Sequence, residues 1–295
     1  MTETTPTLDE ATRQALAIAQ RNEITEHHIY SRLAKLVKNP ANSRVLAKIG
    51  DDELRHYHYW KTFSGKDESP DSAQVRWYVT LARTLGLTFA LKLMERGEMG
   101  AQKAYDHLDA TIRGAKAISH EEADHEQQLI GMIDEDMLKY VGSVVLGLND
   151  ALVELTGALA GFTLALQNVR LIGMTGLITG IAASLSMAAS EYVSTKSEKD
   201  ARNPGKAALY TGIAYVITVV WLIFPYYVAG DYLAALAWTM LNALLIILGF
   251  TYYVSVAQDL PFRRRFIETV AISFGVAALS FGIGYVVRQV LGIEI

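Results

Sequence analysis

Residues 53–60 read ELRHYHYW and residues 120–126 read HEEADHE, and each stretch contains the pattern Glu-x-x-His. Side chains three positions apart lie on one face of a helix, so the carboxylate and the imidazole of one pattern can reach a common point. Both are ligand types of divalent transition metals, and two such patterns predict a pair of metal ions. The residues concerned are Glu53 and His56 in the first pattern, and Glu122 and His125 in the second.

Residues 1–139 show helical periodicity with almost no strand signal. The first expected helix is capped by Thr7 or Asp9 and ends at about Lys38, and the others span about residues 40–63, 73–105 and 106–134. Helices of this length make a bundle, and a di-iron carboxylate bundle takes one Glu from each of two helices and Glu-x-x-His from each of the other two. We therefore expect a four-helix bundle with these metal ligands: Glu23, Glu53, His56, Glu95, Glu98, Glu122 and His125.

Two positions compete as the ligand of the third helix. Glu95 and Glu98 form Glu-x-x-Glu, so one can bridge two ions while the other is terminal or mobile. The remaining acidic and histidine residues fall off the shared face, and we expect them to be solvated: Glu26, His27, His28, His58, His120, Glu121, Asp124 and Glu126. The alternative for the whole set is four charged helix faces in water.

The composition excludes several other kinds of site. The chain has 295 residues, which suits two domains, and it has no cysteine, so disulfides, thiolate zinc sites and iron–sulfur clusters are excluded. Its 27 basic and 31 acidic residues give a formal charge of −4, which offers no basis for binding nucleic acid. Any metal must be held by carboxylate, imidazole, thioether or backbone oxygen.

The composition changes near Tyr140, where a charged N-terminal part gives way to apolar sequence. Of the 27 Lys and Arg residues, 18 precede this point. Five apolar runs follow, each of the length, about 20 residues, that crosses about 30 Å of hydrocarbon as a helix. We expect an all-α chain with a soluble domain at 1–139 and a membrane domain at 140–295. The expected membrane helices span about residues 141–166, 171–193, 207–229, 232–257 and 266–287.

The charges of the connecting loops predict the orientation of the membrane domain. The loops after the second and fourth runs carry seven Lys or Arg residues, whereas the other connections and the C-terminus carry only Arg170 and Arg288. Basic loops stay in the cytoplasm, and the N-terminus MTETTPTLDEATRQ lacks a signal-peptide pattern. We expect the N-terminal domain inside and the C-terminus outside.

The first two apolar runs contain side chains that hydrocarbon disfavours. Asp150 and Glu154 are four residues apart in the first run, and Met187 and Glu191 are four apart near the inner end of the second. A charge at the bilayer centre costs at least about 2.5–3.5 kcal/mol, so such groups usually face a cavity or a partner. No Lys or Arg lies deep enough to pair with the first two. We expect a cation path lined by these four residues; the alternative is a pair of protonated carboxyls hydrogen-bonded between helices.

Both halves resemble known families through these residues. Residues 140–292 resemble the vacuolar iron transporter family through GLNDALVELTGALAG and SMAASEYVSTKSEKD. The fusion of the two halves in this order resembles the membrane-bound ferritins of bacteria and archaea. Residues 8–136 resemble the erythrin-type, ferritin-like domains related to rubrerythrin, through Glu23, Glu53-x-x-His56, Glu95-x-x-Glu98 and Glu122-x-x-His125.

The resemblance implies export of cytosolic Fe²⁺, or Mn²⁺, by proton exchange in a homodimer. It places this homodimer in the lipid bilayer of a prokaryotic cell (inner) membrane, with the metal path between the first two membrane helices. It also implies a di-iron site in the N-terminal domain, with Mn or Zn as alternative metals. Eukaryotic members carry a longer cytoplasmic insert where this chain has only residues 195–206, so we expect the N-terminal domain to collect ions instead.

Two functions of different classes follow. In the first, the chain is a transporter whose N-terminal domain captures, senses or oxidises iron while the membrane domain moves it outward. In the second, it is a membrane-anchored di-iron ferroxidase or peroxidase whose membrane half is only an anchor. The metal ligands themselves would form that ferroxidase centre, and no other catalytic residue is assigned. An anchor needs one helix rather than five with acidic residues, which favours the transporter.

Overall fold

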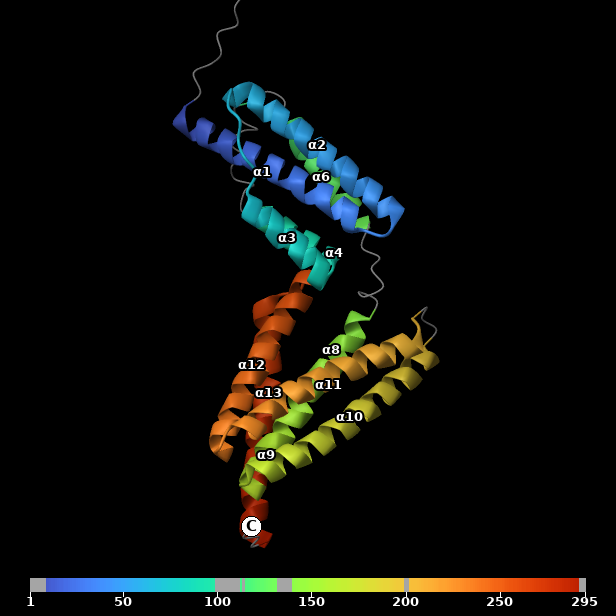
Figure 1. Cartoon of the computed structure of the whole chain (residues 1–295), viewed down its shortest axis with the longest axis vertical. Coiled ribbons are helices and arrows are strands. Elements are labelled where there is room, and N and C mark those ends of the chain that lie inside the picture. Colours follow the sequence, from blue (N-terminus) through green and yellow to red (C-terminus); the bar gives the residue numbers. More distant parts are fainter. Residues whose placement is uncertain (1–8, 99–111, 113–114, 132–139, 199–201, 292–295) are drawn as a thin grey trace, which may run out of the picture. The chain divides into compact units, whose positions relative to one another are not determined.

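The computed structural model describes residues 9–98, 112, 115–131, 140–198 and 202–291, and every regular element within them is a helix (Figure 1). This confirms the expectation of an all-α chain. The chain separates into two compact units, Met1–Glu135 and Asp136–Ile295.

The N-terminal unit begins with its two longest helices. Asp9 caps the first, since its Oδ1 accepts the backbone N–H of Thr12 over 2.7 Å. The second starts at Pro40, where the missing N–H costs nothing because the first turn of a helix leaves that group unpaired. The described helices of this unit are α1 (Glu10–Leu36), α2 (Pro40–Ser64), α3 (Ser72–Leu85), α4 (Leu87–Glu98) and α6 (Ala115–Gly131).

The single helix expected over residues 73–105 is wrong, because Gly86 interrupts it between α3 and α4. This residue has φ 95° and ψ 154°, a conformation that glycine adopts without the steric penalty of a Cβ. Of the helix expected over 106–134, α6 covers residues 115–131. The rest of that range, apart from Ile112, lies outside the described residues.

Helices α1 and α2 form an antiparallel pair, side by side in Figure 1. Two side-chain contacts mark its two ends: Ser43 Oγ donates to the carbonyl oxygen of Ala34, and Ser64 Oγ donates to Oε1 of Gln20, each over 2.7 Å. His27, which the sequence placed at the surface, is half-buried between these ends. Its Nδ1 lies 2.6 Å from the carbonyl oxygen of Gly50.

Two apolar clusters of the N-terminal unit enclose a polar layer. The first cluster includes Ile29, Leu33, Leu46 and Ile49, and the second includes Leu16, Ala19 and Trp60. Glu23 on α1, and Glu53 and His56 on α2, fall between these clusters along their helices. The four-residue spacing of the apolar positions therefore brings the acidic residues into the interior along with them.

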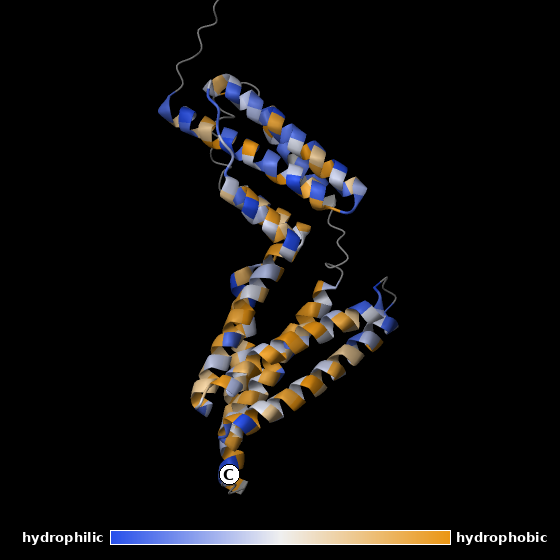
Figure 2. Cartoon of the chain, in the orientation of Figure 1, coloured by the Kyte–Doolittle hydropathy of each residue, from blue (hydrophilic) through white to orange (hydrophobic). Residues whose placement is uncertain are grey.

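Within its described residues, the C-terminal unit contains five helices long and apolar enough to cross a membrane, which confirms that expectation. Figure 2 shows their predominantly apolar residues. The first spans Val141–Leu166 and contains a π-helical turn that the sequence did not predict. The elements are α8 (Val141–Asp150), η1 (Ala151–Leu155), α9 (Thr156–Leu166), α10 (Val169–Ser197), α11 (Pro204–Val228), α12 (Tyr232–Ala257) and α13 (Phe262–Leu291).

Glycine residues allow two close helix contacts within this unit. A Cβ added to Gly147 would lie 2.4 Å from the carbonyl oxygen of Thr211, where α8 meets α11. A Cβ added to Gly284 would lie 2.2 Å from the carbonyl oxygen of Gly161, where α13 meets α9. These contacts hold the first membrane-length helix tightly against its neighbours, as small residues do in membrane helix packing.

Candidate functional site

Three helices of the N-terminal unit bring carboxylates and imidazoles to one buried point. Glu23 comes from α1, Glu53 and His56 come from α2, and Glu122 comes from α6. One ligand atom from each lies within 4.8 Å of all the others. The first three side chains are each only 1% exposed. Residues of both Glu-x-x-His patterns therefore meet in a group that could hold a metal ion.

One ring nitrogen of each histidine faces this point. Nδ1 of His56 lies 2.9 Å from Oε1 of Glu122, 3.4 Å from Oε2 of Glu53 and 3.5 Å from Oε2 of Glu23. Nδ1 of His125 lies 3.2 Å from Oε1 of Glu53 and 3.7 Å from Oε2 of Glu122. The two imidazoles are stacked with their centroids 5.9 Å apart, so the cluster has two imidazole nitrogens and three carboxylates.

Several of these atoms are close together without being well directed at one another. Among the described residues, Nδ1 of His56 and of His125, Oε2 of Glu53 and Oε1 of Glu122 are buried and lack a hydrogen-bond partner of good geometry. Leaving a buried polar group unpaired costs about 1–3 kcal/mol. Lone pairs that converge on one point fit a bound cation, and this mixture of oxygen and nitrogen donors suits Fe, Mn or Zn.

The opposite nitrogen of each histidine is held by a carboxylate from the other helix. Nε2 of His56, on α2, lies 3.0 Å from Oε2 of Glu121, on α6. Nε2 of His125, on α6, lies 3.3 Å from Oδ2 of Asp52, on α2. Arg55 joins the two supports, with Nη2 2.8 Å from Asp52 Oδ1 and 2.5 Å from Glu121 Oε2. Such partners orient imidazole ligands and fix their tautomers.

The sequence analysis did not predict that Asp52, Glu121 and Arg55 support the two histidines. The expectation that Glu121 is merely solvated is wrong, because its carboxylate contacts both Arg55 and His56. An available signal was the acidic residue directly before the Glu of each pattern, Asp52 in the first and Glu121 in the second. Periodicity alone places those residues one position off the buried face, and only the meeting of α2 with α6 brings them to the histidines.

Trp60 supplies a further contact that the sequence did not indicate. Its indole Nε1 donates to Oε1 of Glu23 over 2.9 Å, and the ring is 0% exposed. The hydrogen bond engages one carboxylate oxygen, while Oε2 of Glu23 lies on the side of His56. Trp60 therefore fixes the orientation of Glu23 within the cluster.

The buried groups perturb one another's protonation. Burial raises the pKa of Glu23 well above its ordinary value. Burial also opposes ionisation of Glu53, but the neighbouring imidazoles of His125 and His56 outweigh it and lower the pKa of Glu53 to about 2. Burial would lower the pKa of His125, but the carboxylates of Glu122 and Glu53 raise it to about 10. A metal ion that binds here has to displace protons from the imidazoles.

The two candidate ligands of the third expected helix are not brought to the cluster by the described contacts. Glu95, on α4, pairs with Lys92 over 3.2 Å, and its side chain is 37% exposed. Glu98 is the last residue of α4, and its side chain lies outside the part of the chain that the structure describes. Both assignments therefore stay predictions.

The C-terminal unit holds a second group of acidic residues, at the π-helical turn. Asp150 ends α8 and Glu154 lies within η1. Tyr215 of α11, which is 0% exposed, donates its hydroxyl to Oε2 of Glu154 over 3.2 Å. Glu154 itself is exposed on the surface of the unit. No Lys, Arg or His occurs in α8, η1 or α9, and π-helical turns occur frequently at functional sites.

The other two residues predicted for the path lie on α10. Glu191 is 8% exposed, and Ser143 of α8 donates its hydroxyl to Oε1 of Glu191 over 2.5 Å. Thr195, one turn further along α10, donates to the same oxygen over 3.4 Å. Met187 packs against the apolar cluster that includes Tyr215. Glu191 of α10 is thus held by two hydroxyl groups, one from α8 and one from its own helix, that the sequence analysis did not single out.

Residues 141–203 match the sequence model of the VIT family. This VIT family domain contains Asp150, Glu154, Met187 and Glu191, and it indicates a metal-ion transporter. Together with the five membrane-length helices, it indicates an integral membrane protein. A search of curated proteins and a search of solved structures each found no match.

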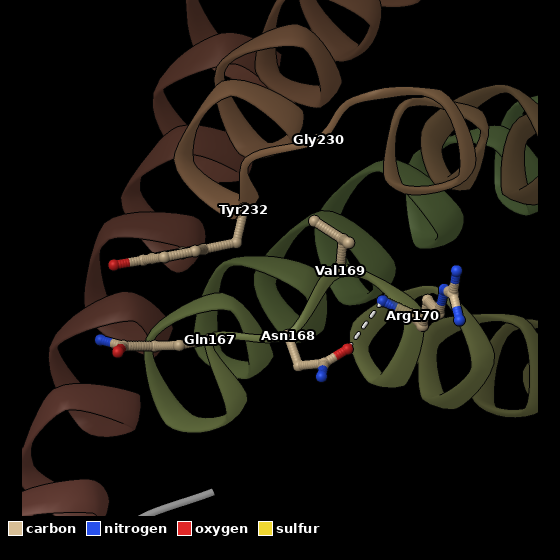
Figure 3. A pocket seen from close by; sticks show the side chains of 6 residues that line it. All are labelled: Gln167, Asn168, Val169, Arg170, Gly230 and Tyr232. Carbon is tan, nitrogen blue, oxygen red and sulfur yellow. Dashed lines mark hydrogen bonds between the residues drawn. The ribbon is translucent and has the colours of Figure 1, made fainter.

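A pocket of about 350 Å³ lies in the C-terminal unit (Figure 3). It is formed where α9 turns into α10 and where α11 turns into α12. Its only charged side chain is Arg170, and Asn168 caps α10 by accepting the backbone N–H of Arg170. Its lining residues are Gln167, Asn168, Val169, Arg170, Gly230 and Tyr232. None of these six lining residues is acidic.

Proposed function

We propose that the chain exports cytosolic Fe²⁺, or Mn²⁺, across a prokaryotic cell membrane in exchange for protons. The observation that carries this proposal is the pair Asp150 and Glu154, two carboxyls in a membrane-length helix that has no basic residue. In hydrocarbon, negative charge must be neutralised by a bound cation or by protons. The same two groups can therefore take up either and exchange one for the other.

Glu191 and Met187 extend this path toward the basic loop after α10. Glu191 receives the ion at the cytoplasmic end, held by the hydroxyl of Ser143. The thioether of Met187 favours a transition metal over Ca²⁺ or Mg²⁺, since sulfur is a soft ligand. The proposed orientation, with the N-terminal unit inside and the C-terminus outside, rests on the seven basic residues of the two loops on that side.

The exposure of Glu154 supports a homodimer. This carboxylate lies on the surface of a membrane-length helix, where contact with lipid costs at least about 2.5–3.5 kcal/mol. A second copy of the chain that covers the same face removes the carboxylate from lipid and encloses a polar path. We therefore place the path at an interface between two copies.

The N-terminal unit is proposed to be a ferritin-like four-helix bundle that captures, senses or oxidises iron. The ligands that we propose are Glu23, Glu53, His56, Glu95, Glu98, Glu122 and His125. Asp52 and Glu121 hold the two imidazoles in place. Iron bound there supplies the one-electron redox chemistry that these side chains lack. The residues themselves bind, orient and release protons as the metal enters.

The test is metal flux by the full-length chain in proteoliposomes loaded with a fluorescent Fe²⁺ indicator. Asp150→Ala should abolish flux, because the path loses its central carboxylate. The double variant Glu53→Ala/Glu122→Ala should still transport, with altered dependence on Fe²⁺ concentration. Undiminished flux with Asp150→Ala would sink the proposed path.

An anchored di-iron ferroxidase is the second candidate, and the buried Glu and His cluster favours it. This function predicts that the full-length chain consumes oxygen when Fe²⁺ is added and that Glu53→Ala/Glu122→Ala stops this. Absence of flux from every version, combined with such oxygen consumption, would replace the transporter with the enzyme. Both activities in one preparation would mean that the two units have separate roles.

A further inference from the structure

The sequence assigned the cation path to the first two membrane-length helices, but the structure brings a third helix to it. Tyr215 lies on α11, far from Glu154 in the sequence, and its hydroxyl donates to Oε2 of Glu154 over 3.2 Å. No signal in the apolar run of residues 204–228 distinguishes this tyrosine from others in the same helix.

Three further observations connect α11 with the path. Thr211, one turn before Tyr215, is 0% exposed and donates its hydroxyl to the carbonyl oxygen of Ser143 over 2.9 Å. Ser143 in turn binds Glu191. Gly147 of α8 approaches the backbone of Thr211 so closely that a Cβ would lie 2.4 Å from its carbonyl oxygen. Polar groups of α11 thus contact Glu154 directly and the backbone of Ser143, whose hydroxyl donates to Glu191.

We infer that Tyr215 is a positioning residue for cation transport and that α11 forms a third wall of the path. This rests on the proposed transport function. The phenol ring of Tyr215 belongs to a buried apolar cluster with Leu152, Leu155 and Val219, and this packing fixes the position of its hydroxyl. It engages one oxygen of Glu154 and leaves the other for a cation shared with Asp150.

The hydrogen bond between Tyr215 and Glu154 lies at the π-helical turn, where it restrains the Glu154 side chain. Glu154 belongs to η1, and a π-helical turn displaces its side chains from the register of a continuous α-helix. Glu154 is exposed and has no basic neighbour on its own helix. The hydroxyl of Tyr215 therefore restrains a side chain that would otherwise rotate freely toward the interface. A restrained carboxylate binds a cation more tightly than one that must be ordered on binding.

The experiment is Fe²⁺ flux by the full-length chain in proteoliposomes, with Tyr215→Phe as the variant. The substitution removes the hydroxyl and keeps the ring. We expect KM for Fe²⁺ to rise about 10-fold with maximal flux retained, because the bond is one from a hydroxyl to a charged group. Tyr226→Phe is the matched control: Tyr226 is 1% exposed on the same helix, and its hydroxyl pairs with Thr163 over 2.7 Å. The control should transport like the unaltered chain.

Two more variants separate positioning from packing. Glu154→Asp shortens the side chain and moves the carboxylate out of reach of the Tyr215 hydroxyl. It should therefore raise KM as Tyr215→Phe does. On this Glu154→Asp background, Tyr215→Phe should have no further effect, because coupled residues are non-additive. Unchanged KM in Tyr215→Phe, an equal rise in KM in Tyr226→Phe, or additive effects with Glu154→Asp would each overturn the inference. An unaltered chain that moves no metal would instead overturn the proposed function.

Discussion

The carboxylate of Asp52 contacts the imidazole of His125 across two helices, with Oδ2 3.3 Å from Nε2. The reciprocal contact runs from Glu121 to His56, with Oε2 3.0 Å from Nε2. The acidic residue before each Glu-x-x-His pattern therefore supports the histidine of the other pattern, and each pattern itself provides candidate metal ligands. This reciprocity makes the two halves of the candidate metal centre depend on one another.

Replacing Asp52 by asparagine should weaken metal binding at the N-terminal unit. The amide is nearly isosteric but removes the charge that orients His125, and loss of such a partner typically costs about 10–100-fold in metal affinity. The measurement is anaerobic titration of the full-length chain in detergent with Co²⁺, followed by its visible spectrum. Asp51→Asn is the matched control, because Asp51 is the exposed neighbour on the same helix. Equal affinities of the two variants would contradict the supporting role of Asp52.

Metal binding to this unit should release protons and strengthen as pH rises. In the metal-free protein the pKa of His125 is about 10, and that of His56 is also raised, so both imidazoles are protonated at neutral pH. Each must lose its proton before it binds a metal, which predicts an affinity gain of up to about tenfold per pH unit for each proton released. Calorimetric titration with Mn²⁺ in buffers of different ionisation enthalpy measures the protons directly.

The control for that titration is Glu53→Ala/Glu122→Ala, which removes the site and leaves the membrane unit intact. Its residual binding reports on the membrane carboxylates alone and is subtracted. A site-specific affinity that stays constant between about pH 6 and 8 would mean that the imidazoles are not ligands.

Ser143→Ala should impair entry of the ion without unfolding the membrane unit. The variant removes the hydroxyl that donates to Glu191 over 2.5 Å, so the carboxylate loses its fixed orientation. We expect KM for Fe²⁺ flux to rise about 10-fold, as for other hydrogen bonds to charged groups. Ser184→Ala is the control, since the hydroxyl of the buried Ser184 donates to the carbonyl oxygen of Ile181 on its own helix. If Ser143→Ala and Ser184→Ala gave the same dependence of flux on Fe²⁺ concentration, Ser143 would have no role in transport.

Gly284→Ala should destabilise the membrane unit through overpacking. The new Cβ would lie 2.2 Å from the carbonyl oxygen of Gly161, so α13 must move away from α9. Overpacking of this kind typically costs about 1–3 kcal/mol. The measurement is Tm in detergent, with Gly275→Ala as the control on the same helix, because a Cβ there meets nothing within 4 Å. A Tm for Gly284→Ala at or above that of the control would show that the two helices do not pack this closely.

Local sequence patterns were sufficient to predict the features that lie within a single helix. The i to i+3 spacing of Glu53 and His56 fixed their common face, and the length of the apolar runs fixed the number of membrane-length helices. Pro40 marked the start of α2 for a local steric reason. The break at Gly86 was missed, because a helical pattern tolerates glycine and only its backbone conformation ends the helix.

The sequence by itself determined which residue types share a face and which segments suit a membrane, since both follow from the periodicity and apolarity of single helices. The tertiary structure alone decided which face meets which: Glu121 reaches His56, Trp60 reaches Glu23, and Tyr215 reaches Glu154. Each of these contacts joins different helices. Their register depends on how all side chains along the interface pack, and no local pattern carries that information.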